Sequence, residues 1–364
     1  MQKKSRLKLF LATLILTFSC STSVLAKSTD ESAIKKNVQA EKNKSSKSSK
    51  DSKTSNSDKS KKNVKSPKNP REVRPTVLPR SSVKKAEPVA PRVSAATALG
   101  LGKHGDELNL KSNVAIIVDQ QNQDIIFDKN SQIPLPVASI TKLLTAMVVL
   151  DAKLPLDEIL EINDQDAAIY KSSRLIKGTT LSRQEALLLA LMSSENRAAY
   201  TLGRNYPGGI KAFMAAVNRK TKEIGMKNAA FEDPTGLTSK NVASAEDLAI
   251  LVNAAYQYPL IRQFTTTPNH IKEINQRDQQ FLNSNRLVRS GDMEVLIQKT
   301  GYISEAGRCL VMMALVNNKP YTMVFLDSVG VQSRFADAIR VKEWIESSER
   351  AALRKLPNTR LVTN

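Results

Sequence analysis

The chain has 364 residues and a formal net charge of +20. Residues 1–26 carry four Lys or Arg and no Asp or Glu, and residues 27–97 carry 19 basic and 7 acidic residues, so about +4 remains for residues 98–364. A fold that binds nucleic acid is expected to carry its basic residues on a folded face. The location of the charge therefore argues against nucleic acid as a partner.

The first 26 residues are typical of an export signal. Four basic residues precede the apolar run Leu9 to Phe18, and Val24 to Ala26 supplies the small residues at which a signal peptidase cuts. Cys20 leaves lipid modification as an alternative, although the bulky Phe18 fits such sites poorly. No later stretch is long and apolar enough to span a membrane. We expect the mature chain to start at Lys27 and to be located in the periplasm.

Residues 27–97 form a Lys/Ser-rich and then Pro-spaced segment with almost no aromatic residues. Such a composition cannot bury enough apolar surface to fold, so we expect a disordered tether. Its charge can attract anionic wall polymers or lipids by long-range electrostatics, and a plain spacer is the alternative. We expect one folded domain over residues 98–354 and a short tail over 355–364.

The first half of the folded part predicts a hairpin and several helices. Two β-branched runs, Val114 to Val118 and Ile125 to Phe127, flank a polar turn and predict a β-hairpin. An apolar helix begins at Ser139. A second begins with the capping box Ser182/Glu185 and runs to Met192. Two further helices follow, one ending near Gly225 and one that opens with Ser244 and is stopped by Pro259.

The second half returns to strands. The stretches "EVLIQKTGY", "RCLVMMALVNN" and "YTMVFLDS" predict three strands, with the turn "NNKP" joining the last two. A closing helix carries Trp344 on its apolar face with Ile339 and Ile345. Strands, a helical block, and then strands with a terminal helix predict an α+β fold, in which helices pack on an antiparallel sheet and an all-helical lobe is inserted.

Three short motifs carry the candidate chemistry. Ser139 and Lys142 lie three residues apart at a helix start, Ser194 and Asn196 lie at a corner between two helical segments, and Lys299-Thr300-Gly301 interrupts an apolar strand. Each alone is weak, since a helix cap or a solvated strand end explains it. Together and in this order, S-x-x-K, S-x-N and K-T-G are the signature of penicillin-binding proteins and class A β-lactamases.

A serine hydroxyl needs a base within hydrogen-bond reach before it can attack a carbonyl. His104 and His270 lie near no nucleophile motif, and we interpret both as surface residues, with His270 in a polar loop. Lys142 can serve instead if burial, helped by repulsion from Lys299, lowers its pKa. Two scattered histidines and Cys309 suggest no metal site. Cys309 is the one cysteine expected in the mature chain, which excludes an internal disulfide.

The stretches "PVASITKLLTAMVVLDA", "LMSSENRAA", "FEDPTGLTSKNVASAEDLA" and "IQKTGYISEAGRCLVMMA" resemble the low-molecular-mass penicillin-binding proteins of the D-alanyl-D-alanine carboxypeptidase and endopeptidase family, over roughly residues 113–349. Within that family the endopeptidase branch is the most similar. The resemblance implies a serine peptidase without a cofactor, which cuts peptidoglycan stem peptides and is acylated by β-lactams.

The resemblance also assigns roles. Ser194 is expected to pass a proton to the leaving amine, and Asn196 to orient Lys142 and the substrate. The backbone N–H groups of Ser139 and Tyr302 are expected to bind the oxyanion, Gly301 to let the substrate approach the strand, and Lys299 with Thr300 to bind a substrate carboxylate.

The alternatives are a carboxypeptidase with the same chemistry, a class A β-lactamase and a non-catalytic wall-binding protein. The β-lactamase is disfavoured because Glu223, Glu232 and Asp233 stand in no Glu-x-x-Leu-Asn pattern.

Overall fold

The computed structural model describes residues 93–355 except positions 104 and 171. The predicted signal peptide, Cys20, His104 and nearly all of the predicted tether lie outside the described residues. No helix within the described residues is long and apolar enough to cross a lipid bilayer.

The strands are β1 (Ser112–Asp119), β2 (Asp124–Lys129), β3 (Leu135–Pro136), β4 (Ile159–Glu161), β5 (Thr180–Ser182), β6 (Val242–Ala243), β7 (Asn269–Ile274), β8 (Arg277–Leu282), β9 (Glu294–Ile303), β10 (Gly307–Val316) and β11 (Lys319–Ser328). The helices are α1 (Ala95–Ala98), the 3₁₀-helix η1 (Ala138–Thr141), α2 (Lys142–Asp151), α3 (Asp164–Ile169), α4 (Arg183–Met192), α5 (Asn196–Arg204), α6 (Gly209–Glu223), α7 (Ala245–Tyr256), α8 (Pro259–Thr266), α9 (Arg286–Ser290) and α10 (Ser333–Lys355).

Five antiparallel strands form the central sheet in the order β2-β1-β11-β10-β9. The predicted hairpins β1–β2 and β10–β11 are both present. Asn317 and Asn318 join β10 to β11 with φ of 50° and 62°, the left-handed conformation that a two-residue hairpin turn favours. The strand β9 lies at the edge of this sheet, so one side of it is open to other groups.

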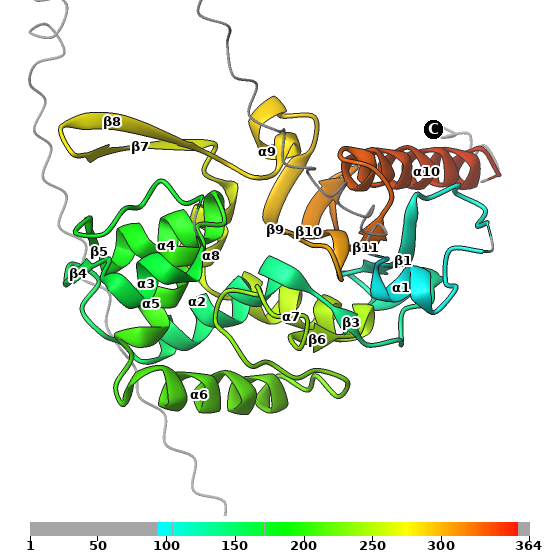
Figure 1. Cartoon of the computed structure of the whole chain (residues 1–364). Helices are drawn as coiled ribbons and strands as arrows, with labels where there is room; N and C mark the ends of the chain where they lie inside the picture. Colours follow the sequence, from blue (N-terminus) through cyan, green and yellow to red (C-terminus); the bar gives the residue numbers. More distant parts are fainter. Residues whose placement is uncertain (1–92, 104, 171, 356–364) are drawn as a thin grey trace, which may run out of the picture. The chain divides into compact units, whose positions relative to one another are not determined.

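Both faces of the sheet are covered. Side chains alternate along a strand, so Val114 and Ile116 of β1 face the helical lobe while Ala115 and Ile117 face α10. Figure 1 shows α10 on one side of the sheet and α7 with the helical lobe on the other. The predicted α+β fold with an inserted helical lobe is therefore confirmed. Trp344 of α10 packs edge-on against Phe127, with ring centroids 6.4 Å apart.

The helix α2 lies among the other helices of the lobe. Every residue from Lys142 to Val149 is buried, and α2 contacts α4, α5, α6 and α7. The predicted capping box of Ser182 and Glu185 is confirmed at the start of α4. A helix surrounded by other elements in this way gives its first turn a fixed position, which matters for the residues placed there.

Three details differ from the sequence-based expectations. The segment around His270 is the hairpin β7–β8, not a polar loop, and its turn is formed by Asn275 and Gln276 with positive φ. Its strands are too polar to show an apolar alternation, so the pattern was not visible. Pro259 begins a further helix, α8, after α7 ends. Ser94 caps α1 and donates a hydrogen bond to Asp327, so the folded part begins before residue 98.

Candidate active site

Ser139 and Lys142 meet at the junction of η1 and α2. The Nζ of Lys142 lies 2.8 Å from the Oγ of Ser139, 2.7 Å from the Oδ1 of Asn196 and 2.7 Å from the backbone oxygen of Thr235. The i and i+3 positions of a helical turn bring the first two together. The two motifs S-x-x-K and S-x-N thus converge on one amine, as the sequence predicts.

The hydrogen-bond partners fix the direction of a proton transfer. A neutral lysine amine has two N–H bonds and one lone pair, whereas the oxygens of Asn196 and Thr235 can only accept hydrogen bonds. When Lys142 is neutral, its two hydrogens therefore point to those oxygens and its lone pair points to the hydroxyl of Ser139. This arrangement can deprotonate the serine.

Burial allows the amine of Lys142 to be neutral near pH 7. The side chain of Lys142 is fully buried, and this burial lowers its pKa from 10.5 to about 7, while the charges of Asp233 and Glu195 act in the opposite direction. Burial, then repulsion from Lys142 and Arg334, lowers the pKa of Lys299 well below 10.5. Repulsion from Lys299, which we expected to lower the pKa of Lys142, is not among the causes that act on Lys142, and the repulsion acts on Lys299 instead.

The turn with Ser194 is sharply bent. The helix α4 ends at Met192 and α5 begins at Asn196, and Ser194 between them has φ of 65°. The backbone N–H of Glu195 donates to the oxygen of Leu189, which ties the turn to α4. Ser194 and Ser139 line the same cavity.

The strand β9 approaches η1 closely. A side chain at Gly301 would place its Cβ 2.9 Å from the backbone oxygen of Val137 and 3.3 Å from the backbone nitrogen of Ser139. Only glycine fits so close a contact without a shift. Gly301 therefore brings the edge strand next to the backbone N–H of Ser139. Next along the strand, Tyr302 is 56% exposed.

Lys299 and Thr300 have different surroundings. Lys299 is fully buried and its Nζ donates to the backbone oxygen of Thr300 at 3.0 Å. The hydroxyl of Thr300 lies 2.7 Å from that of Ser284, and Thr300 lines the cavity, whereas Lys299 does not. Of the two groups expected to bind a carboxylate, the threonine alone faces the open space.

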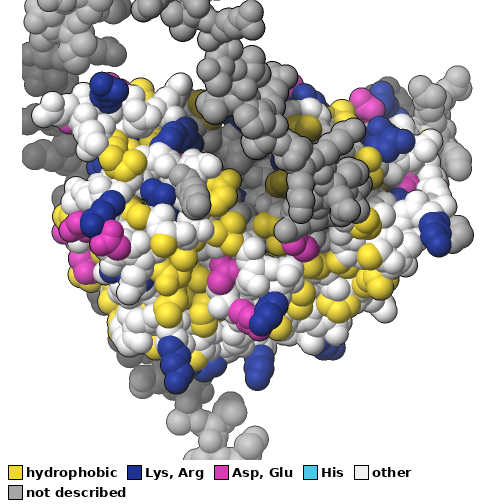
Figure 2. Space-filling view, viewed as in Figure 1, with side chains coloured by type: hydrophobic (Ala, Val, Ile, Leu, Met, Phe, Trp, Pro, Cys, Tyr) yellow, Lys and Arg dark blue, Asp and Glu magenta, His cyan; other side chains and the backbone are white. Residues whose placement is uncertain are grey.

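The cavity has a volume of about 340 Å³ and lies between β9 and the turn after α4. It contains the predicted residues Ser139, Ser194, Asn196, Thr300, Gly301 and Tyr302, and also Tyr170, Ser172, Ser173, Arg174, Ser193, Glu195 and Arg334. The second group was not predicted, because nothing in the local sequence distinguishes these residues from surface residues. Figure 2 shows one face of the molecule, on which basic and acidic side chains are interspersed.

Arg334, at the start of α10, brings a cation to the cavity. Its side chain is mostly buried, and its Nε makes no hydrogen bond within the described structure. The guanidinium lies 4.4 Å from the ring centre of Phe335. Burial and the neighbouring Arg308 lower its pKa to about 10, so it stays charged at neutral pH. No carboxylate among the described residues pairs with it.

The loop over residues 232–241 provides the backbone oxygen that accepts a hydrogen bond from Lys142. Asp233 accepts hydrogen bonds from the backbone N–H groups of Thr235, Gly236 and Thr238, which fixes the Thr235 carbonyl toward Lys142. A Cβ at Gly236, which has φ of 82°, would lie only 1.9 Å from the oxygen of Ala138. The Asp-Pro-Thr-Gly sequence signals a turn, but not its contact with the candidate base.

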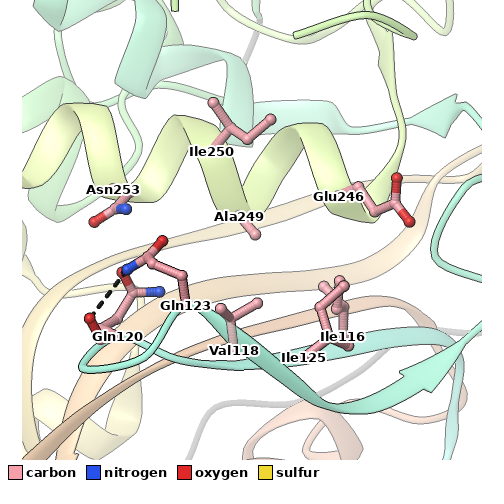
Figure 3. Close-up of a pocket in the computed structure, with 9 residues that line it drawn as sticks. All are labelled: Ile116, Val118, Gln120, Gln123, Ile125, Glu246, Ala249, Ile250 and Asn253. Atoms are coloured by element: carbon pink, nitrogen blue, oxygen red, sulfur yellow. Dashed lines mark hydrogen bonds between the residues drawn. The ribbon is translucent and has the colours of Figure 1, made fainter. Parts of the chain in front are cut away.

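A second cavity, of about 250 Å³, lies between α7 and the β1–β2 hairpin. Figure 3 shows Ile116, Val118, Ala249 and Ile250 among its lining residues, with a hydrogen bond joining Gln123 and Gln120 at its rim. None of the predicted site residues lines it, and His270 on β7 lines neither cavity.

Residues 102–330 match the family described as D-alanyl-D-alanine carboxypeptidase, peptidase S11. The chain belongs to this family. It is 44% identical over 248 residues to the D-alanyl-D-alanine endopeptidase of Pseudomonas aeruginosa, covering 67% of this chain and 80% of that protein. It is 43% identical over 268 residues to the D-alanyl-D-alanine endopeptidase of Escherichia coli K12, covering 72% and 86%.

Solved structures agree with the fold. The Streptomyces K15 DD-transpeptidase aligns with a TM-score of 0.60 at 23% identity, covering 65% of this chain and 97% of that one. Penicillin-binding protein D2 of Listeria monocytogenes, in its ampicillin-bound form, aligns with a TM-score of 0.57 at 26% identity, covering 65% and 98%. The S11 assignment thus makes the chain a serine DD-peptidase, as the sequence motifs predict.

Proposed function

We propose that this S11 peptidase hydrolyses the D-alanyl cross-links of peptidoglycan in the periplasm, with Ser139 as nucleophile and Lys142 as base. The observation that carries the proposal is the 2.8 Å contact between Lys142 Nζ and Ser139 Oγ, at an amine whose pKa burial lowers to about 7. The names of the Pseudomonas and Escherichia relatives support the substrate and the endopeptidase specificity.

In the first step the lone pair of Lys142 takes the proton of Ser139 as its Oγ attacks the D-alanyl carbonyl carbon. The proton then passes through the hydroxyl of Ser194 to the leaving amine, and the C–N bond breaks to give an acyl-enzyme. Water, deprotonated by Lys142, attacks the ester, and Ser139 regains its proton. Asn196 keeps the amine of Lys142 oriented throughout.

The negative charge of the tetrahedral intermediate falls on the carbonyl oxygen. The backbone N–H groups of Ser139 and Tyr302 are the proposed donors, and the close approach at Gly301 supports this pairing. Losing one such donor typically costs about 3 to 4 kcal/mol in the transition state.

The substrate carboxylate beside the scissile bond is bound by Thr300 and Arg334. Both line the cavity, and Arg334 is a charged donor without a carboxylate partner among the described residues. We therefore propose Arg334 as the cation that binds the carboxylate, in place of Lys299, which is fully buried and does not line the cavity. A carboxylate lies next to both a cross-link and a terminal D-Ala-D-Ala, so this contact serves an endopeptidase and a carboxypeptidase equally.

None of the acids considered for a β-lactamase lines the cavity that contains Ser139. Glu223 pairs with Lys220 at 3.1 Å and Glu232 pairs with Lys240 at 3.1 Å. Asp233 is used by the backbone of its own loop. β-Lactams are accordingly proposed as covalent inhibitors that remain attached to Ser139.

The decisive experiment incubates the purified protein with fluorescent penicillin and with cross-linked stem-peptide dimers. The Ser139→Ala variant is expected to lose both labelling and dimer cleavage while keeping its circular dichroism spectrum. Labelling of Ser139→Ala at the wild-type rate would exclude Ser139 as the nucleophile. Rapid D-Ala release from pentapeptides with intact dimers would replace the endopeptidase assignment with the carboxypeptidase one.

A further inference from the structure

A further cavity adjoins the proposed active site at Arg174. A cavity of about 440 Å³ is lined by Arg174, Ile176, Ile274, Asn275, Arg277 and Gln279. It lies between the segment after α3 and the hairpin β7–β8, and we call it the hairpin groove. Arg174 lines this groove and also the cavity that contains Ser139. The two spaces are therefore neighbours on either side of one side chain.

Arg174 is held firmly at this boundary. Its guanidinium lies 4.2 Å from the ring centre of Phe281 and donates to the backbone oxygen of Gln280 at 2.6 Å. On the other side it approaches Glu195 at 3.4 Å, and Ser173 donates to the same carboxylate at 2.7 Å. These contacts join the hairpin to the turn that carries Ser194 and Asn196.

The direction of the substrate follows from the carboxylate contact. If Thr300 and Arg334 bind the carboxylate on the leaving side of the bond, the leaving peptide passes Thr300. Beyond Thr300 lies Ser284, 2.7 Å from it, and Asn283 next to Ser284 pairs with Pro268 at the base of the hairpin. The side of the cavity at Thr300 thus leads toward β7–β8, which Figure 1 shows reaching over the helical lobe.

The groove side of the hairpin is polar and cationic. The register pairs Lys272 with Gln279 and Ile274 with Arg277, so these four residues share one face with the buried Phe281. The acidic residues Glu273 and Asp278 pair on the opposite, exposed face. Lys272 is bound by Glu185 at 3.0 Å, whereas Arg277 forms no ion pair with a described carboxylate.

We propose that the hairpin groove is the subsite for the leaving stem peptide of a cross-linked dimer, an anionic peptide whose carboxylates meet Arg277 and Arg174. This inference rests on the proposed function. It explains how identical catalytic groups favour a cross-link, because the single D-Ala released from a pentapeptide is too short to reach the groove. Residues of β8 are then specificity determinants of the endopeptidase.

The test uses two variants that add the same charge to opposite faces of one strand. Gln279→Glu places a carboxylate in the groove, and Gln280→Glu places one on the outer face as the matched control. Arg277→Ala removes the unpaired cation. Each protein is assayed on cross-linked dimers and on dimers in which carboxamides replace the carboxylates of the leaving stem. Penicillin labelling measures the fraction of molecules with an active site, and the rates are corrected for this fraction.

Gln279→Glu and Arg277→Ala are expected to lower kcat/KM for the carboxylate dimer by about fivefold, the upper range for one exposed charge contact. Gln280→Glu is expected to match the wild type, and the wild type is expected to cut the carboxamide dimer more slowly. Wild-type cleavage by both groove variants, or equal losses on the two dimers, would overturn the inference while Ser139 still labels. Failure of the wild-type protein to label would instead overturn the proposed function.

Discussion

The rate of acylation is expected to follow the protonation state of Lys142. Burial lowers the pKa of this amine from 10.5 to about 7. An unperturbed lysine is neutral in only about one molecule in 3000 at pH 7, whereas a pKa of about 7 makes about half the molecules neutral. The buried site thus supplies about a thousandfold more base at neutral pH. Below the midpoint the rate should fall about tenfold for each pH unit.

The measurement is the second-order rate constant for acylation by a fluorescent penicillin between pH 5 and pH 10. We expect a rise with a midpoint near 7 and a plateau above it. Glu195→Gln removes a charge that raises the pKa of Lys142, so its midpoint should lie at lower pH with a similar plateau. A rate that does not change with pH, or a Glu195→Gln midpoint displaced to higher pH, would refute the role of neutral Lys142.

Three further outcomes are expected. Gly236→Ala should lower the free energy of unfolding, measured in urea, by more than about 2 kcal/mol, because φ of 82° is strained for alanine and the added Cβ meets Ala138. Gly225→Ala is the control: φ is 87° and the space around it is open, so this variant should show the cost of the backbone strain alone. Lys142→Met should raise Tm most below pH 7, and the gain should shrink as the pH rises toward 10.5. The reason is that Lys142 binds its proton more weakly in the folded protein, with a pKa of about 7, than in the unfolded chain, with a pKa of 10.5, so the lysine destabilises the fold at low pH and ceases to do so above pH 10.5. Deletion of residues 27–92 should leave turnover of soluble substrates unchanged and weaken sedimentation with anionic wall polymers, and sedimentation that is independent of salt would contradict an electrostatic tether.

The proposed nucleophile and base could be predicted because their geometry is local. Ser139 and Lys142 lie one turn apart, and the apolar residues that follow them predict a buried helix that fixes both. Asn196 was identified by its motif, although its 2.7 Å contact with Lys142 depends on how α5 packs on α2. Short-range periodicity therefore fixed the elements, and motif order selected the residues.

Residues that act only through tertiary contacts could not be predicted. Thr235 contributes a backbone oxygen, and since every residue has one, the sequence does not single Thr235 out. Arg334 lies in the first turn of α10, where nothing in the sequence indicates that it reaches the cavity. The hairpin β7–β8 was missed because its inward face mixes His270, Lys272 and Arg277 with few apolar residues. Its position depends on Phe281 and Ile274 packing on the lobe, which no sequence pattern reveals.

The surroundings of the two buried lysines support the proposal that Arg334, and not Lys299, binds the substrate carboxylate. Lys142 faces the carboxylates of Asp233 and Glu195, which partly offset its burial, whereas the charged neighbours that act on Lys299 are cations. Burial and repulsion from these cations therefore both lower the pKa of Lys299, and no carboxylate is among the charges that act on it. The proposed carboxylate contact requires a cation that burial does not easily neutralise, and a guanidinium meets that requirement because its ordinary pKa is far above neutrality.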